Sequence, residues 1–120
     1  MEKLFEGEYR VMEVLWDAAQ DLPAREVARR LEQSVGWNKN TTYTVIKRLC
    51  DKGCLKNEAA VVTSLVDRAT VQQADGQEVL QRSFHGSLPS FLAAFLRAGS
   101  VSDQEAAEIE QMLEEYRQSH

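Results

Sequence analysis

The sequence predicts a mostly α-helical fold with three parts: a unit of three short helices, a small two-stranded β wing, and a C-terminal helical region. Apolar residues recur at helical spacing over roughly the first 50 residues, with breaks at Pro23 and Gly36, and short β-rich runs follow. A length of 120 residues, 43% hydrophobic and 28% charged, suits one small domain with an extension. We therefore expect a winged helix-turn-helix domain over residues 1–66 and a helical dimerisation region over residues 67–120.

The first two helices are expected over residues 6–18 and 23–35. Tyr9, Met12, Leu15 and Trp16 share one face of the first. The second starts at a proline, which a helix tolerates in its first turn, and ends at a glycine suited to a left-handed cap.

The third helix is expected to begin after Asn38 or Asn40, either of which can cap it, and to end near Lys52. One side of this helix is an apolar stripe that also contains a threonine. A buried threonine hydroxyl needs a hydrogen-bond partner, and we expect it to donate to the backbone carbonyl oxygen one turn back. This inward stripe consists of Thr42, Val45, Ile46 and Leu49.

A β hairpin is expected after the third helix, from the segments "CLKNE" and "VVTSLV" separated by two alanines. A helical conformation stays an alternative for this segment, because it lacks an Asn-Gly or Asp-Gly turn. Three helices followed by a hairpin is the winged-helix arrangement.

The C-terminal half is expected to form three helices without a core of their own, over residues 67–84, 90–98 and 100–118, the last opened by a capping box from Ser102 to Glu105. The middle helix is too short to fold alone and has a wide apolar surface, which the last helix can cover. We expect two copies of the chain to pack through these surfaces, with an intramolecular bundle as the alternative. The apolar residues are Leu88, Phe91, Leu92, Phe95 and Leu96 in the middle helix and Ala106, Ile109, Leu113 and Tyr116 in the last.

The net charge of −5 is unevenly distributed: basic and acidic residues are ten each up to Val66, and four against nine after it. A basic patch survives around the third helix, where only Asp51 opposes five cations, and such a patch suits a polyanion. The five cations are Lys39, Lys47, Arg48, Lys52 and Lys56.

Several protein classes are not expected. No segment resembles a secretory signal or a membrane span, which predicts a cytoplasmic protein. Cys50 and Cys54 lack the second pair of a zinc site and are expected to be ordinary thiols, while His85 and His120 are isolated. Without a phosphate loop, nucleophile elbow or carboxylate pair, we expect no catalytic residues, metal or cofactor, and thus no enzyme.

The outward face of the third helix consists of hydrogen-bonding and basic side chains, which suits DNA recognition. Rotation of about 100° per residue places Asn40, Tyr43, Thr44 and Lys47 opposite the apolar stripe, with Lys39, Thr41 and Arg48 at its edges. Asparagine pairs with adenine, threonine with bases or phosphates, and lysine and arginine with phosphates or guanine. The helix N-terminus, with free amide groups near Lys39 and Thr41, also favours a phosphate. These features predict a helix-turn-helix recognition helix.

Six segments follow one another along the chain: "EYRVMEVLW", "PAREVARRL", "GWNKNTTYTVIKRLCDKGCLK", "SLVDR", "FHGSLPSFLAAFL" and "SDQEAAEIEQMLEEYR". Through these segments, with Glu8, Trp16 and Trp37 among the strongest elements, the chain resembles the BlaI/MecI penicillinase-repressor family of bacterial transcriptional regulators. The resemblance implies a homodimeric repressor of a palindromic operator in double-stranded DNA, with a sensor or protease as a further partner. The resemblance assigns DNA contact to seven residues: Lys39, Asn40, Thr41, Tyr43, Thr44, Lys47 and Arg48. It assigns dimerisation to eight residues: Phe84, Leu88, Phe91, Leu92, Phe95, Ile109, Leu113 and Tyr116.

Departures from the family pattern favour weaker DNA binding. Asn40 and Thr42 replace a basic and an apolar residue usual in the family, and the wing "KNEAAVV" lacks basic and aromatic tip residues. Ala94-Phe95 stands where the resistance repressors have Asn-Phe, which argues against regulation by proteolysis, and the C-terminal C-x-C motifs of the copper-responsive branch are absent. The alternative is a winged-helix protein-interaction module that has lost specific DNA binding.

Overall fold

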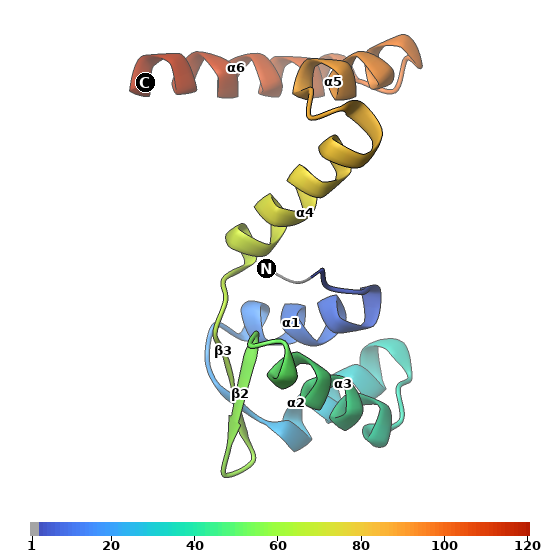
Figure 1. The fold of residues 1–120 in the computed structure, drawn as a ribbon, viewed down its shortest axis with the longest axis vertical. Helices are drawn as coiled ribbons and strands as arrows, with labels where there is room; N and C mark the ends of the chain where they lie inside the picture. Colours follow the sequence, from blue (N-terminus) through green and yellow to red (C-terminus); the bar gives the residue numbers. More distant parts are fainter. Residues whose placement is uncertain (1–2) are drawn as a thin grey trace. The chain divides into compact units, whose positions relative to one another are not determined.

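The computed structural model describes residues 3–120, which fall into two compact units, the first ending at Asp75 and the second running from Gly76 to His120. Figure 1 traces the chain through its helices and strands from the N-terminus to the C-terminus. The elements are α1 (Glu6–Ala18), β1 (Leu22–Pro23), α2 (Ala24–Val35), α3 (Lys39–Asp51), β2 (Leu55–Glu58), β3 (Val61–Ser64), α4 (Arg68–Phe84), α5 (Leu88–Arg97) and α6 (Asp103–Ser119).

The three helices α1, α2 and α3 pack around one apolar core, as the helical spacing predicts. The stripe of each helix is buried, and side chains from the sheet and from the start of α4 complete the core. Fully burying one such side chain contributes about 1.5–3 kcal/mol to folding. The core residues include Val11, Met12, Leu15, Val27, Leu31, Val45, Ile46, Leu49, Leu55, Val62 and Val71.

Local signals place the helix ends close to their predicted positions. Gly36 has a φ of 73°, the left-handed conformation expected of the residue that ends α2. Asn38 caps α3, and its side-chain oxygen accepts a hydrogen bond from the Asn40 amide at 2.7 Å. Of the two candidate caps, the structure therefore uses Asn38.

The predicted hairpin forms, and a third strand adds to it. β2 and β3 pair antiparallel, and β1 pairs with the other edge of β3 through Leu22 with Val62 and Pro23 with Val61. The sequence did not predict β1, because two residues are too short for an alternating pattern. Proline suits this position because β1 is an edge strand, where one missing amide donor is tolerated.

The turn between β2 and β3 has two alanines in the left-handed region, Ala59 with φ 52° and Ala60 with φ 63°. Two successive positive φ values characterise the type I′ turn, which matches the twist of a hairpin. The left-handed conformation is less favourable for alanine than for glycine, by roughly 1–2 kcal/mol per residue. Contacts outside the turn compensate, including a hydrogen bond of 2.9 Å from the Ala24 amide to the Ala60 carbonyl oxygen. The helical alternative for this segment is not adopted.

The first unit therefore has the winged-helix arrangement: three helices, a hairpin after the third, and a short strand that completes the sheet. The chain is mostly α-helical, and in residues 3–120 the β structure is confined to this small sheet.

The second unit consists of helices with well-formed ends and little interior. α5 begins two residues earlier than predicted, because Ser87 caps it by accepting from the Ser90 amide at 3.1 Å and Pro89 fits its first turn. α6 opens with the predicted capping box, in which Ser102 and Glu105 exchange hydrogen bonds of 3.0 and 3.1 Å. No residue of α5 or α6 is buried. Over residues 3–120, every helix is too short or too polar to cross a membrane.

Candidate nucleic-acid interface

A tight turn joins α2 to α3. The amide of Gly36 donates to the Glu32 carbonyl at 3.0 Å, and the amide of Trp37 donates to the Leu31 carbonyl at 3.3 Å, so the end of α2 is closed by backbone bonds. The Trp37 ring lies against Gly7 of α1, where an added methyl group would stand 3.4 Å from the ring. Trp37 thus packs against α1 directly before Asn38, the residue that caps α3.

α3 separates a buried face from an exposed face as predicted. Its inward stripe is buried, and Leu49 and Thr42 have no exposed surface. All seven residues expected to contact DNA are exposed on the same helix: Lys39, Asn40, Thr41, Tyr43, Thr44, Lys47 and Arg48.

The N-terminal amide groups of α3 are less available than the sequence suggests. The Asn38 side chain accepts from the Asn40 amide, and the Asn38 carbonyl accepts from the amides of Thr41 and Thr42 at 3.0 and 3.3 Å. The cap residue therefore engages three of the amide groups that the sequence suggested were free, which leaves fewer of them for a phosphate near Lys39 and Thr41.

Two threonines of α3 have opposite hydrogen-bonding states. The exposed Thr44 hydroxyl donates to the Asn40 carbonyl one turn back at 2.9 Å, which leaves its oxygen and methyl group for a ligand. The buried Thr42 hydroxyl has no hydrogen-bond partner among the described residues. The predicted bond from Thr42 to the carbonyl one turn back is therefore absent, and the unmade bond leaves a desolvated polar group inside the core.

Ion pairs reduce the predicted basic patch from five cations to three. The ammonium group of Lys52 lies 2.7 Å from the buried Glu8 carboxylate, and that of Lys56 lies 3.7 Å from Glu58 on the wing. The sequence could not reveal the first pair, because its members are 44 residues apart. Lys39, Lys47 and Arg48 have no ion pair with any residue in the range 3–120.

A groove of about 420 Å³ lies between α3 and the wing. Tyr43, Ile46, Lys47 and Cys50 line it from the helix and Asn57 from β2, so two predicted contact residues face a wing residue that the sequence did not single out. Only knowledge of how the hairpin folds back onto α3 could have identified Asn57.

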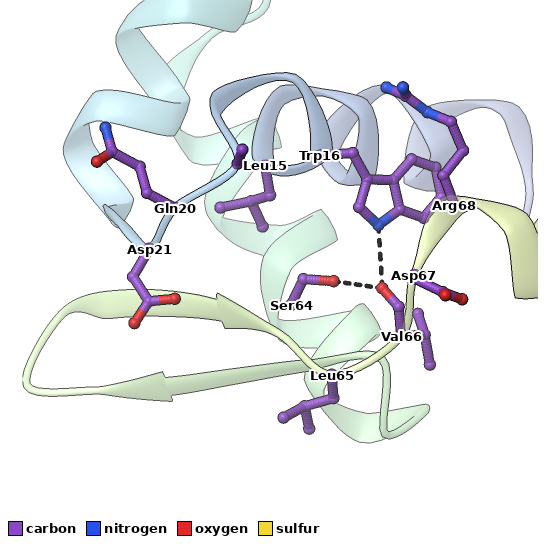
Figure 2. A pocket seen from close by; sticks show the side chains of 10 residues that line it. Leu15, Trp16, Gln20, Asp21, Ser64, Leu65, Val66, Asp67 and Arg68 are labelled. Atoms are coloured by element: carbon purple, nitrogen blue, oxygen red, sulfur yellow. Dashed lines mark hydrogen bonds between the residues drawn. The ribbon is translucent and has the colours of Figure 1, made fainter.

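A second cavity, of about 550 Å³, lies where the end of α1 meets the segment between β3 and α4. Its polar groups are used internally: the Trp16 indole N–H at 3.0 Å and the Ser64 hydroxyl at 2.6 Å both donate to the Val66 carbonyl, as Figure 2 shows. The Arg68 guanidinium pairs with Asp17. These bonds link α1 to the start of α4 and the segment before it, and none of the residues that line the cavity belongs to α3.

Neither Cys50 nor Cys54 takes part in a disulfide bond within residues 3–120. Burial, together with the nearby Asp51 carboxylate, raises the pKa of the Cys50 thiol, which disfavours a reactive thiolate. Over residues 3–120, no three histidine, cysteine or acidic residues gather in a way that could hold a metal ion.

The residues expected at a dimer interface lie on α4, α5 and α6 and remain partly or largely exposed in one chain. Phe91 contacts Phe84 and Phe95 edge-on or tilted, with ring centroids 5.2 and 5.0 Å apart. Phe84, Phe91, Leu92 and Ile109 are half-buried, and Leu88, Phe95, Leu113 and Tyr116 are exposed.

The three packed helices, the exposed face of the third helix and the hairpin together define a winged helix-turn-helix protein, a class in which the corresponding helix lies in the major groove of DNA. The penicillinase repressor family model matches residues 5–115. The chain therefore belongs to the penicillinase repressor family. It is 28% identical, over 119 residues that cover 96% of this chain and 92% of the relative, to a penicillinase repressor of Bacillus licheniformis.

Proposed function

We propose that this protein is a homodimeric transcriptional repressor that binds a dyad operator in double-stranded DNA through α3. The main support is the outer face of α3, where three cations that form no ion pair within residues 3–120 and four further polar residues are exposed on one rigid helix. Membership of a repressor family, which is not a family of enzymes, supports the same function.

Each residue of this face has a role that its chemistry suits. Lys39, Lys47 and Arg48 neutralise phosphates or bond to guanine, and the Asn40 carboxamide can pair with adenine. Thr44 offers its oxygen and its methyl group, because its proton is engaged by the helix backbone. Thr41 and Tyr43 complete the face with hydroxyl groups.

The charge of the interface limits the expected affinity. Three cations per subunit correspond to six phosphate contacts in a dimer, and thus to a slope of roughly −5 for log K against log salt. Lys56 contributes little on the wing, because Glu58 lies within 3.7 Å of it. We therefore expect moderate affinity with a clear salt dependence.

Dimerisation is assigned to residues 67–120 and DNA binding to residues 1–66. The support is the exposure of large apolar side chains on α5 and α6: Leu88 is 61% exposed, Leu113 51% and Tyr116 61%. Monomeric soluble proteins rarely expose so many large apolar side chains on neighbouring helical turns. A second copy of the chain would offer a matching apolar surface that covers them. Ala94 and Phe95 at the usual cleavage position argue against control by proteolysis, although a sensor partner remains part of the proposal.

The proposal is tested by fluorescence anisotropy with DNA from upstream of the protein's own gene, a scrambled competitor, and several salt concentrations. We expect competitor-resistant binding that weakens with salt. Lys47→Ala and Arg48→Ala should each make the salt slope shallower, by roughly 0.9 for every phosphate that the variant no longer neutralises, with unchanged helicity. Absence of binding at low salt would instead favour the alternative, a winged-helix module that binds a protein partner. The ion pairs of Lys52 and Lys56, which leave fewer unpaired cations for DNA, are a reason to test that alternative.

A further inference from the structure

Lys52, at the C-terminal cap of α3, has its charge inside the protein and away from the outer face of that helix. Its ammonium group donates to the Glu8 carboxylate at 2.7 Å and to the Lys3 carbonyl at 2.8 Å. The same group lies 4.7 Å from the centroid of the Phe5 ring, and the side chain is only 14% exposed. Lys52 therefore connects the end of α3 to the first turn of α1.

Glu8 is the centre of this connection. Its side chain is 1% exposed, and one carboxylate oxygen accepts both from Lys52 and from the Phe5 amide at 2.8 Å, so it caps α1 as well. The other oxygen is buried without a hydrogen-bond partner in the described part of the chain. A buried carboxylate depends strongly on its cation, because removal of either partner leaves an uncompensated charge.

Apart from Thr42, the side chains that α3 buries in the core are apolar. Burial of side chains such as Val45, Ile46 and Leu49 holds the helix in place, but apolar attraction has no preferred direction. A short hydrogen-bonded ion pair depends on direction as well as distance. The pair lies one to two turns beyond Lys47 and Arg48, so a small rotation or tilt of α3 that moves these side chains would also stretch it.

We propose that Lys52 is a positioning residue for DNA binding, whose buried pair with Glu8 sets the orientation in which α3 presents its outer face. The inference rests on the proposed function of that face. Contacts to bases need accurate placement of side chains, whereas contacts to phosphates tolerate small displacements and contain no sequence information. Loss of the pair should therefore reduce binding to the operator more than binding to unrelated DNA.

The test compares full-length variants by anisotropy, with operator and scrambled DNA, at temperatures where circular dichroism shows each variant to be folded. Lys52→Met removes the donor of the pair, and Glu8→Gln removes the negative charge, each with little change in shape. The double variant Glu8→Gln with Lys52→Met removes both charges, a change that often restores stability. Lys56→Met is the matched control, because it removes a lysine from an exposed ion pair.

We expect the folded single variants to bind operator roughly tenfold more weakly, the loss that follows when about one base pair is no longer recognised. Binding to scrambled DNA and the salt slope should not change. The double variant should regain thermal stability without regaining operator affinity, whereas Lys56→Met should leave the preference for operator unchanged.

Three results would overturn the inference. The first is that folded Lys52→Met binds operator as tightly as the native protein does. The second is that the double variant regains operator affinity together with stability, which would show that the pair contributes only to stability. A decrease in salt slope of roughly 0.9 would instead identify Lys52 as a phosphate contact. Two other results would contradict the proposed function itself: the native protein does not bind DNA, or Lys47→Ala leaves DNA binding unchanged.

Discussion

The two compact units differ in where their apolar side chains find partners. In the described part of the chain, the fully buried hydrophobic residues all lie between Leu4 and Val71, inside the first unit. α5 and α6 have apolar stripes of similar composition, yet none of their residues is buried. An apolar stripe therefore indicates that a helix needs a partner, without indicating whether that partner belongs to the same chain.

The same lesson applies to charge. Lys47 and Lys52 lie five residues apart at one end of α3, and one is exposed while the other is 14% exposed and paired with Glu8. A cation counts toward a DNA-binding surface only if no internal carboxylate neutralises it. Three tests examine how each unit depends on the partners of its side chains.

The largest effect is expected in the second unit, from Phe91→Asp. If two copies bury this side chain, an unpaired carboxylate in the interface should weaken dimerisation by about 3–5 kcal/mol, enough to give monomers at micromolar concentration. Sedimentation equilibrium measures the change. Ser90→Asp, which adds the same carboxylate at an exposed polar position of α5, serves as the control and should leave the dimer intact. A Phe91→Asp dimer of native strength would exclude this surface as the interface.

A second test removes the same side chain from each unit. Leu49→Ala should lower the free energy of unfolding of the first unit by about 2–5 kcal/mol, because Leu49 has no exposed surface. Leu88→Ala should change it by less than about 0.5 kcal/mol, because Leu88 is 61% exposed and lies in the other unit. Urea unfolding followed by tryptophan fluorescence is selective, since Trp16 and Trp37 both lie in the first unit. Equal shifts for both variants would show that the first unit does not depend on its own core alone.

The smallest effect is an increase in stability from Thr42→Val. Valine has nearly the shape of threonine and removes the buried hydroxyl that has no partner within residues 3–120, so the free energy of unfolding should rise by about 1–3 kcal/mol. Thr41→Val, at an exposed position of the same helix, is the control and should change stability by less than about 0.5 kcal/mol. Thermal unfolding compares the two. A destabilised Thr42→Val would mean that the hydroxyl is hydrogen-bonded in solution.

Much of the first unit was predictable because its signals are local. The first helix was expected over residues 6–18 and is found as Glu6–Ala18, and the cap at Gly36 and the inward stripe of α3 were also predicted. Such features depend on side chains within one or two turns of each other, and a periodicity of 3.6 residues reveals them. The outer face of α3 follows from the same periodicity.

The features that the sequence did not predict depend on contacts between residues far apart along the chain. β1 exists because β3 returns beside Leu22 and Pro23, and the turn at Ala59 and Ala60 adopts a conformation that neither alanine favours alone. The environment of the Thr42 hydroxyl likewise depends on what packs around it. In each case the energy of the assembled unit outweighs a local preference.

The sequence by itself determined the helices, the hairpin, the exposed polar face of α3 and the likeness to a repressor family, because each is encoded in neighbouring residues or in a continuous motif. The tertiary structure alone decided which cations of the predicted basic patch remain exposed and unpaired within residues 3–120. Lys52 is separated from Glu8 by 44 residues, and its charge is removed from the surface only when α1 and α3 come together. Local order fixes which side of a helix is polar, whereas packing decides which of its charges remain free to bind a partner.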